Sequence, residues 1–217
     1  TARRHYQDRG LRPMIYEERR ITLKRGTFGD YRQFVLEKIW KNLERDGHQP
    51  LCLLNGLIGA GAEDVILICG FEDYAAWESA QPLIAGHNGE APPRDWITHE
   101  NVRLMRASKH RPSGTTLKAD RRAVYGARRW WIHPEDWEAF NRLSFEGVWP
   151  AMDHMGHHVL GQFRDAAKIS RLEVLNLAGY HDPAHWHATR SPGEHGVPAD
   201  LVETLRRLGR ERESLVL

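Results

Sequence analysis

An internal repeat limits what this chain can fold into more than any other feature of its sequence. When the sequence is slid against itself by 109 positions, thirteen residues between positions 14 and 78 meet an identical partner without a gap. Composition alone predicts roughly four identities over a segment of that length. The matched pairs include Tyr16 with Tyr125, Trp40 with Trp149, Gly47 with Gly156, His48 with His157 and Trp77 with Trp186. We therefore expect two copies of one structural unit.

Both copies carry signals for the same elements in the same order. A strand rich in β-branched and aromatic residues is followed by a helix with apolar residues every three to five positions. A pair of strands, a short helix and a closing strand come next. The opening strands are predicted at 15–23 and 124–132, the helix-ending glycines at Gly47 and Gly156, the N-caps of the short helices at Asp73 and Asp182, and the closing strands at 102–106 and 214–217.

The order β-α-β-β-α-β, present twice, is that of the ferredoxin-like unit. One such unit leaves a sheet face bare, because both of its helices cover the same side. Two units cover each other by packing sheet to sheet, so the sequence predicts an α+β fold that closes into a barrel with its helices outside. We expect repeats at 14–107 and 122–217, an extension at 1–13, and a linker at 108–121 rich in Pro, Gly, Ser and Lys.

Several segments resemble the NIPSNAP family of the dimeric α/β-barrel superfamily. They are the opening MIYEERRITLKRG, the DGH and MGH at the helix ends, and the strands VILICGFEDYAAW and VLNLAGYHDPAHW. The resemblance implies an intramolecular dimeric α/β-barrel, in a superfamily that includes cofactor-free monooxygenases, haem-binding and haem-degrading enzymes and dehydratases. The fold alone therefore names no reaction. Where many family members carry a histidine, this chain has Leu67 and Asn176, so any role of that histidine is lost or passes to Asn176.

Composition narrows the class of partner. The 31 Lys and Arg residues against 29 Asp and Glu give a net charge of +2, without the concentrated basic face that nucleic acid binding requires. No apolar run is long enough to span a bilayer. We therefore expect a cytoplasmic protein with neither nucleic acid nor membrane as partner. Cys52 and Cys69 lie within apolar runs and are predicted to be buried thiols.

The barrel interior is the expected ligand cavity. Alternation along the opening strands places Tyr16, Glu18, Arg20 and Thr22 on one face, with Tyr125, Ala127, Arg129 and Trp131 as their counterparts. If Asn176 and Tyr180 point the same way, the cavity suits a carboxylate or carbonyl group, with arginine as the anchor. The alternative is that the arginines pair with Glu18 or with solvent at the rim. We predict Arg129, Asn176, Tyr180 and His181 as catalytic residues, and Tyr16, Glu18, Arg20, Tyr125 and Trp131 as ligand-binding residues.

Histidines gather in the second copy, which holds eight of the thirteen. Ligation of a divalent metal or haem requires imidazoles that converge in space, and His157, His181 and His185 are the candidates. The alternative for most of them is a polar surface. For His48 and His157, which follow helix-ending glycines, it is a bond to the last helix carbonyls.

The features together favour a small-molecule enzyme or ligand-binding protein with its site inside the barrel, for a carboxylate- or carbonyl-bearing metabolite. One copy is expected to be specialised for the chemistry, because Asn176, Trp131 and His181 replace Leu67, Thr22 and Glu72. Catalysis itself is left open. No cofactor is the first expectation, with haem or a divalent metal as the alternative. The second hypothesis is a non-catalytic scaffold, and the chain is expected to be a pseudo-dimer that stays monomeric or pairs again as a homodimer.

Overall fold

The structure is a computed structural model that describes residues 14–85, 92–111, 121–167 and 169–217. The extension expected at 1–13 and most of the linker expected at 108–121 lie outside these ranges. The strands are β1 (Ile15–Leu23), β2 (Gln49–Asn55), β3 (Asp64–Phe71), β4 (Ile97–Ala107), β5 (Val124–Ile132), β6 (His158–Asp165), β7 (Leu172–Tyr180) and β8 (Gly209–Val216).

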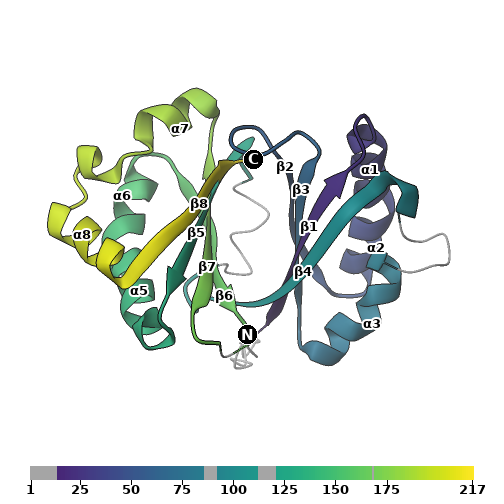
Figure 1. Cartoon of the computed structure of the whole chain (residues 1–217), viewed down its shortest axis with the longest axis horizontal. Helices are drawn as coiled ribbons and strands as arrows, with labels where there is room; N and C mark the ends of the chain where they lie inside the picture. The colour runs from purple at the N-terminus through teal and green to yellow at the C-terminus, as the bar shows by residue number, and fades with distance from the viewer. Residues whose placement is uncertain (1–13, 86–91, 112–120, 168) are drawn as a thin grey trace, which may run out of the picture.

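The helices lie outside the strands, on both flanks of the molecule (Figure 1). The α-helices are α1 (Phe28–Phe34), α2 (Trp40–Arg45), α3 (Tyr74–Ala85), α5 (Trp137–Leu143), α6 (Trp149–His154), α7 (Pro183–Thr189) and α8 (Ala199–Leu208). Short 3-10 turns are η2 (Arg94–Trp96), η3 (Pro134–Asp136) and η5 (Pro192–His195). The π-helical turns η1 (Val35–Ile39) and η4 (Ser144–Val148) join α1 to α2 and α5 to α6.

The strands form one antiparallel sheet in the order β2-β3-β1-β4-β6-β7-β5-β8. Its middle junction is short, because β4 meets β6 only from Met105 to Ala107. Its two ends also meet, since Ile58 bridges to Val216 and the Val216 amide donates to the Ile58 carbonyl at 2.9 Å. The sheet therefore curls into a barrel in which two four-stranded halves face each other. The predicted α+β fold, with sheets facing and helices outside, is confirmed.

Positions 15–107, the first half, and positions 124–216, the second half, share one strand register. Ile15 lies opposite Phe71 in the first half, and Val124 opposite Tyr180 in the second, each number raised by 109. The irregularities recur at the same offset: the bulge after Pro50 in β2 returns after Val159 in β6. Both π-helical turns also recur at this offset. The two halves therefore share the positions of their bulges and π-helical turns as well as the order of their strands.

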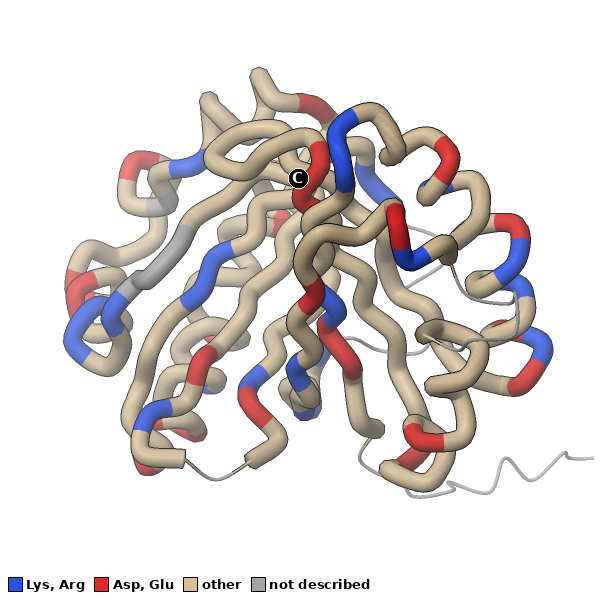
Figure 2. The backbone as a smooth tube through the Cα atoms, turned by 45° about the vertical axis from the view of Figure 1, so that its right-hand side comes forward, with Lys and Arg blue, Asp and Glu red and all other residues tan. Residues whose placement is uncertain are grey.

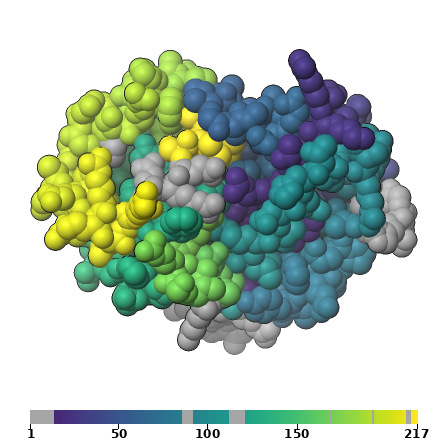
Figure 3. Space-filling view, in the orientation of Figure 1, coloured from purple at the N-terminus to yellow at the C-terminus, as the bar shows by residue number. Residues whose placement is uncertain are grey.

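Apolar side chains fill the barrel and the layer beneath the helices of the first half. Tyr16, Met105, Tyr125 and Phe163 belong to the cluster between the facing sheets. The space-filling view shows the two halves in close contact (Figure 3). A separate cluster, which includes Cys69, packs β1 and β3 against α1, α2 and α3.

The two cysteines are buried and free, as predicted. Cys52 belongs to the cluster inside the barrel and Cys69 to the layer beneath the helices. Burial raises the pKa of Cys52 to about 12. Neither thiol is therefore ionised at neutral pH.

Local signals in the sequence predicted the helix ends. Gly47 and Gly156 have positive φ angles of 84° and 82°, as expected for glycines that end helices. Asp73 and Asp182 cap the helices that follow them, and the Asp182 carboxylate accepts the His185 amide at 2.7 Å. The closing strands are longer than predicted, and α8, which precedes the last one, was missed. Helix α8 packs closely on η4, because Gly147 has no side chain where Leu201 lies.

Acidic and basic positions are interspersed along both halves (Figure 2). Within the described ranges, no helix combines the length and apolar character needed to cross a bilayer. The chain is thus not divided into an acidic and a basic part.

Candidate functional site

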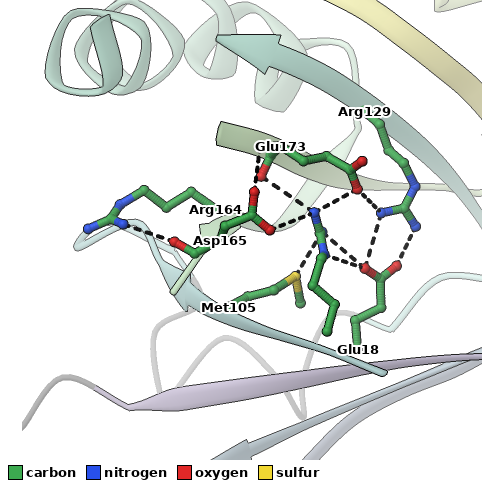
Figure 4. A network of polar contacts seen from close by, with 7 residues as sticks. Glu18, Met105, Arg129, Arg164, Asp165 and Glu173 are labelled. Carbon is green, nitrogen blue, oxygen red and sulfur yellow. Dashed lines mark hydrogen bonds and ion pairs between the residues drawn. The ribbon is translucent and has the colours of Figure 1, made fainter. Parts of the chain in front are cut away.

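The charged residues that point into the barrel pair with one another (Figure 4). Arg129 donates to both carboxylate oxygens of Glu18, through Nη1 at 3.1 Å and through Nη2. Arg103 joins the pair and bonds Glu173 at 2.6 Å and Asp165 at 3.4 Å. Burial alone would raise the pKa of Glu18, but the two guanidinium groups outweigh it and hold this pKa below its ordinary value. The network ties β1 of the first half to β5 and β7 of the second.

Several residues predicted to bind a ligand inside the barrel instead contact other side chains of the protein there. Tyr16 and Tyr125 are packed in the apolar cluster, and Arg129, predicted as catalytic, is committed to Glu18 and Glu173. Trp131 is 36% exposed at the far end of its strand. A cavity of about 460 Å³ beside the network is lined by Glu18, Arg20, Asp64, His99 and Arg103 among others. The sequence left open the alternative that an arginine pairs with Glu18. In the structure, Arg129 forms this pair.

Asn176 and Tyr180 do not share the barrel interior with Arg129, contrary to the arrangement considered from the sequence. Across the β5–β7 pair, Arg129 lies opposite Leu175, and Asn176 lies opposite Arg128. Directly opposed residues point to the same face of a sheet. Asn176 and Tyr180 therefore face the helices of the second half.

That face lines a cavity of about 580 Å³ between the second sheet and its helices. Its floor is Gly126 opposite Ala178 and Arg128 opposite Asn176, with Trp130 next along β5. Helices α6 and α8 contribute the apolar walls Trp149, Met152, Val202 and Leu205. His157, Tyr180 and Thr189 line it as well, as do Arg190, Glu194 and Arg206. Between this sheet and its helices the described buried apolar residues form two separate clusters, whereas the corresponding layer of the first half has one.

The equivalent space of the first half is filled. Glu17 occupies the position that corresponds to Gly126, and its carboxylate accepts from Trp77 Nε1 at 2.6 Å and Gln81 Nε2 at 3.0 Å. Arg19, the counterpart of Arg128, bonds Glu17 at 2.7 Å, Glu100 at 2.6 Å and Gln81 at 2.9 Å. In this half the guanidinium is therefore neutralised and surrounded.

In the second half the arginine remains while its partner is lost. Gly126 supplies no carboxylate, and Arg190 stands where Gln81 stands in the first half. Arg128 donates through Nη2 to the Arg190 carbonyl at 2.9 Å. No carboxylate among the described residues forms an ion pair with it. A Cβ atom on Gly126 would lie 3.1 Å from the ring of Tyr180, so the glycine gives that ring its place.

Three buried polar atoms of residues that line this cavity have no hydrogen-bond partner within the described part of the chain. They are Trp130 Nε1, His157 Nδ1 and Asn176 Oδ1. Buried polar atoms are almost always paired, and each unpaired one costs about 1–3 kcal/mol. Three of the five buried side-chain atoms that lack a hydrogen-bond partner among the described residues thus belong to the lining of this one cavity.

His157, His181 and His185 come close together, with ring centroids 5.2 Å apart for His157 and His185 and 4.9 Å for His181 and His185. Their nitrogens do not converge on one point. His185 Nε2 donates to the Met155 carbonyl at 2.9 Å, while its Nδ1 accepts the His181 amide. No group of three His, Cys, Asp or Glu side chains suited to a metal ion occurs in the described ranges. The bond to a helix-terminal carbonyl that was expected of His157 is thus made by His185.

No family model and no curated protein matches the chain. It is similar over 94% of its length to 93% of a protein from Lactobacillus acidophilus NCFM provisionally described as a monooxygenase, with a TM-score of 0.61 and 12% identity. It is also similar over 94% of its length to 89% of the chlorite dismutase from Candidatus Nitrospira defluvii, with a TM-score of 0.51 and 10% identity. A NIPSNAP family protein from Agrobacterium tumefaciens matches 45% of this chain and 88% of its own, at a TM-score of 0.38 and 20% identity.

The two matches over nearly the whole chain show that it has the dimeric α/β-barrel fold. The NIPSNAP match covers less than half of the chain at a low score and carries no argument. At identities this low, similarity shows the fold but does not identify a ligand.

Proposed function

We propose that this protein binds a small organic carboxylate with a mainly apolar body in the cavity of the second half. The observation that carries the proposal is Arg128, a guanidinium on the cavity floor that lacks the carboxylate its counterpart Arg19 has in Glu17. A guanidinium fork pairs bidentately with a carboxylate, so a ligand would replace the missing Glu17.

The size and chemistry of the cavity support this proposal. A volume of about 580 Å³ lies within the range of small-molecule sites, roughly 300–1,000 Å³. Aromatic and aliphatic side chains of α6 and α8 form walls of the cavity, and polar groups lie on the strands, on α8 and on the segment that follows α7. Among the described side chains that line the cavity, Arg128, Arg190 and Arg206 stand against one acid, Glu194, so their charge favours an anion.

The proposed ligand class is the one expected from the sequence, but the location differs. The sequence favoured the space between the two sheets, where Glu18 and Arg129 neutralise each other. The proposed site lies on the opposite face of the second sheet, beneath α6 and α8. Binding is what the unpaired groups of this cavity support, and the proposal is restricted to it.

The test uses an isosteric change on the cavity floor. Asn176→Asp places a carboxylate directly opposite Arg128 without altering size, and so supplies an internal counter-ion. We expect phenylalkanoates with one to four methylenes to bind the wild-type protein at least tenfold more tightly than their uncharged amides, since a hydrogen bond to a charged group is worth about 1.5–3 kcal/mol. Asn176→Asp should abolish this preference in isothermal titration calorimetry.

Asn101→Asp is the matched control, because it makes the same change of charge on β4, away from this cavity. It should leave the preference for the acid intact. Equal binding of acids and amides, or an acid preference that survives Asn176→Asp, would contradict the proposal.

A further inference from the structure

The hydrogen bonds around His157 fix which of its ring nitrogens carries the proton. Thr189 has one hydroxyl proton, and it donates this proton to the His185 carbonyl at 2.6 Å. The contact of 2.5 Å between Thr189 Oγ1 and His157 Nε2 therefore needs the proton of Nε2. Nδ1 consequently holds a lone pair. It is buried in a side chain that is 4% exposed, and it has no partner in the described part of the chain.

This lone pair stays available across neutral pH. Burial, followed by the neighbouring His185, His195 and Arg128, lowers the pKa of His157 to about 4 against the opposing effect of Asp153. The ring is held in place by Thr189 and by Tyr180, whose ring centroid lies 4.5 Å away. His157 is thus a fixed hydrogen-bond acceptor and not a cation.

The arrangement that fixes the imidazole occurs only in the half that has the cavity. His48, the counterpart of His157, keeps the ring contact, with its centroid 5.1 Å from that of Phe71. At the positions that correspond to Thr189 and His185, however, the first half has Ala80 and Ala76, which offer no side-chain hydrogen bond. The polar support of His157 therefore accompanies the cavity and is not required by the fold.

We infer that the ligand is a hydroxylated carboxylic acid, with its carboxylate on Arg128 and a hydroxyl group that donates to His157 Nδ1. This inference rests on the proposed function and specifies the far end of its ligand. Both residues line the same cavity. A hydroxyl group is favoured over an ammonium group as the donor, because three arginines and one glutamate line the space.

The length of the ligand follows from the sheet. Tyr180, against which His157 packs, lies four residues along β7 from Asn176, the cross-strand partner of Arg128. Four strand residues span about 13 Å, and the arginine side chain covers part of that distance. An aromatic ring with a short carboxylic side chain and a hydroxyl group at the opposite ring position suits the remainder.

The experiment compares three probes of equal length by calorimetry: a 4-hydroxyphenylalkanoate, its 4-methoxy ether and the unsubstituted phenylalkanoate, each with one to four methylenes. We expect the hydroxyl compound to bind the wild-type protein roughly three- to tenfold more tightly than the other two, the value of one neutral hydrogen bond. His157→Phe should remove this advantage while binding of the unsubstituted acid persists. His48→Phe, the matched change in the first half, should leave the advantage in place.

A second variant keeps the inference testable if His157→Phe does not fold. Thr189→Val removes the acceptor that holds the proton on Nε2, so Nδ1–H becomes available and the methoxy ether should gain relative to the phenol. Binding of all three acids without a hydroxyl preference would overturn the inference and leave the proposed function intact. Binding of none of them would overturn the proposed function, and the inference with it.

Discussion

The buried network inside the barrel is where loss of a single charge should cost most. Glu18→Gln removes the carboxylate charge but keeps the side-chain volume. Glu18 and Arg129 are each 1% exposed, and they join the two halves. After the change, Arg129 and Arg103 would share the remaining carboxylates of Glu173 and Asp165.

The magnitude follows from that residual pairing. Removing one partner of a buried ion pair costs about 3–5 kcal/mol. Glu173 still contacts both guanidinium groups, so we expect the lower end, about 3 kcal/mol. For a chain of this size, each kcal/mol shifts the melting temperature by about 2–4 °C, which gives a decrease of roughly 6–12 °C at pH 7.

The pH dependence of this loss has a definite sign. Because the pKa of Glu18 is lowered in the folded state, its charge stabilises the fold fully above the unfolded pKa of about 4.3. That stabilisation is lost as the pH falls through the folded pKa. The difference in unfolding free energy between wild type and Glu18→Gln, measured by urea denaturation, should therefore be largest near neutral pH and shrink in acid.

A surface glutamate gives the control for this experiment. Glu37 is exposed, and within the described part of the chain its side chain accepts a hydrogen bond only from Gln33. Glu37→Gln should therefore change stability by less than about 0.5 kcal/mol. A loss below about 1 kcal/mol for Glu18→Gln at pH 7, or a loss that grows as the pH falls, would refute the reasoning.

Two further predictions concern packing. Gly147→Lys introduces the residue that the first half has at the corresponding position. A Cβ atom at this position would lie 2.0 Å from the Leu201 side chain, so we expect Leu201 to be displaced and α8 to be less stable. Amide hydrogen exchange in Ala199–Leu208 should become faster, and unchanged exchange would contradict the prediction. Cys52 and Cys69 should react with a thiol reagent only slowly in the native protein and rapidly in denaturant, since both are buried and burial raises their pKa values; fast labelling of the native protein would contradict this.

The fold was predictable because its signals are local and occur twice. Positive φ at Gly47 and Gly156 and capping by Asp73 and Asp182 depend on a few neighbouring residues. The order of elements then leaves sheet-to-sheet packing as the way to cover two bare faces. Helix α8 was missed although its apolar residues at 201, 202, 205 and 208 have helical spacing, because the expected β-α-β-β-α-β order contains no third helix.

The candidate site was harder to predict, because it depends on which strand residues lie opposite each other. Alternation correctly placed Glu18 and Arg129 on a common face, but it could not show that they would neutralise each other across the barrel. Asn176 was considered together with Arg129, whereas the register sets it opposite Arg128. A shift of one residue in register changes the face of every side chain, and spacing within one strand does not determine it.

The positions at which the sequences of the two halves differ, and not those at which they are identical, indicate where the cavity lies. Both halves keep the arginine of the opening strand, but Glu17 becomes Gly126 and Cys69 becomes Ala178, two losses of volume at directly opposed positions. A lost carboxylate beside a retained, half-buried arginine leaves a positive charge at the cavity floor without the ion pair that its counterpart Arg19 forms. A change that only weakened the fold would be expected to lose the arginine as well. Its retention, next to the hydrogen-bonded support that holds His157, supports the proposal of a ligand that brings the missing negative charge.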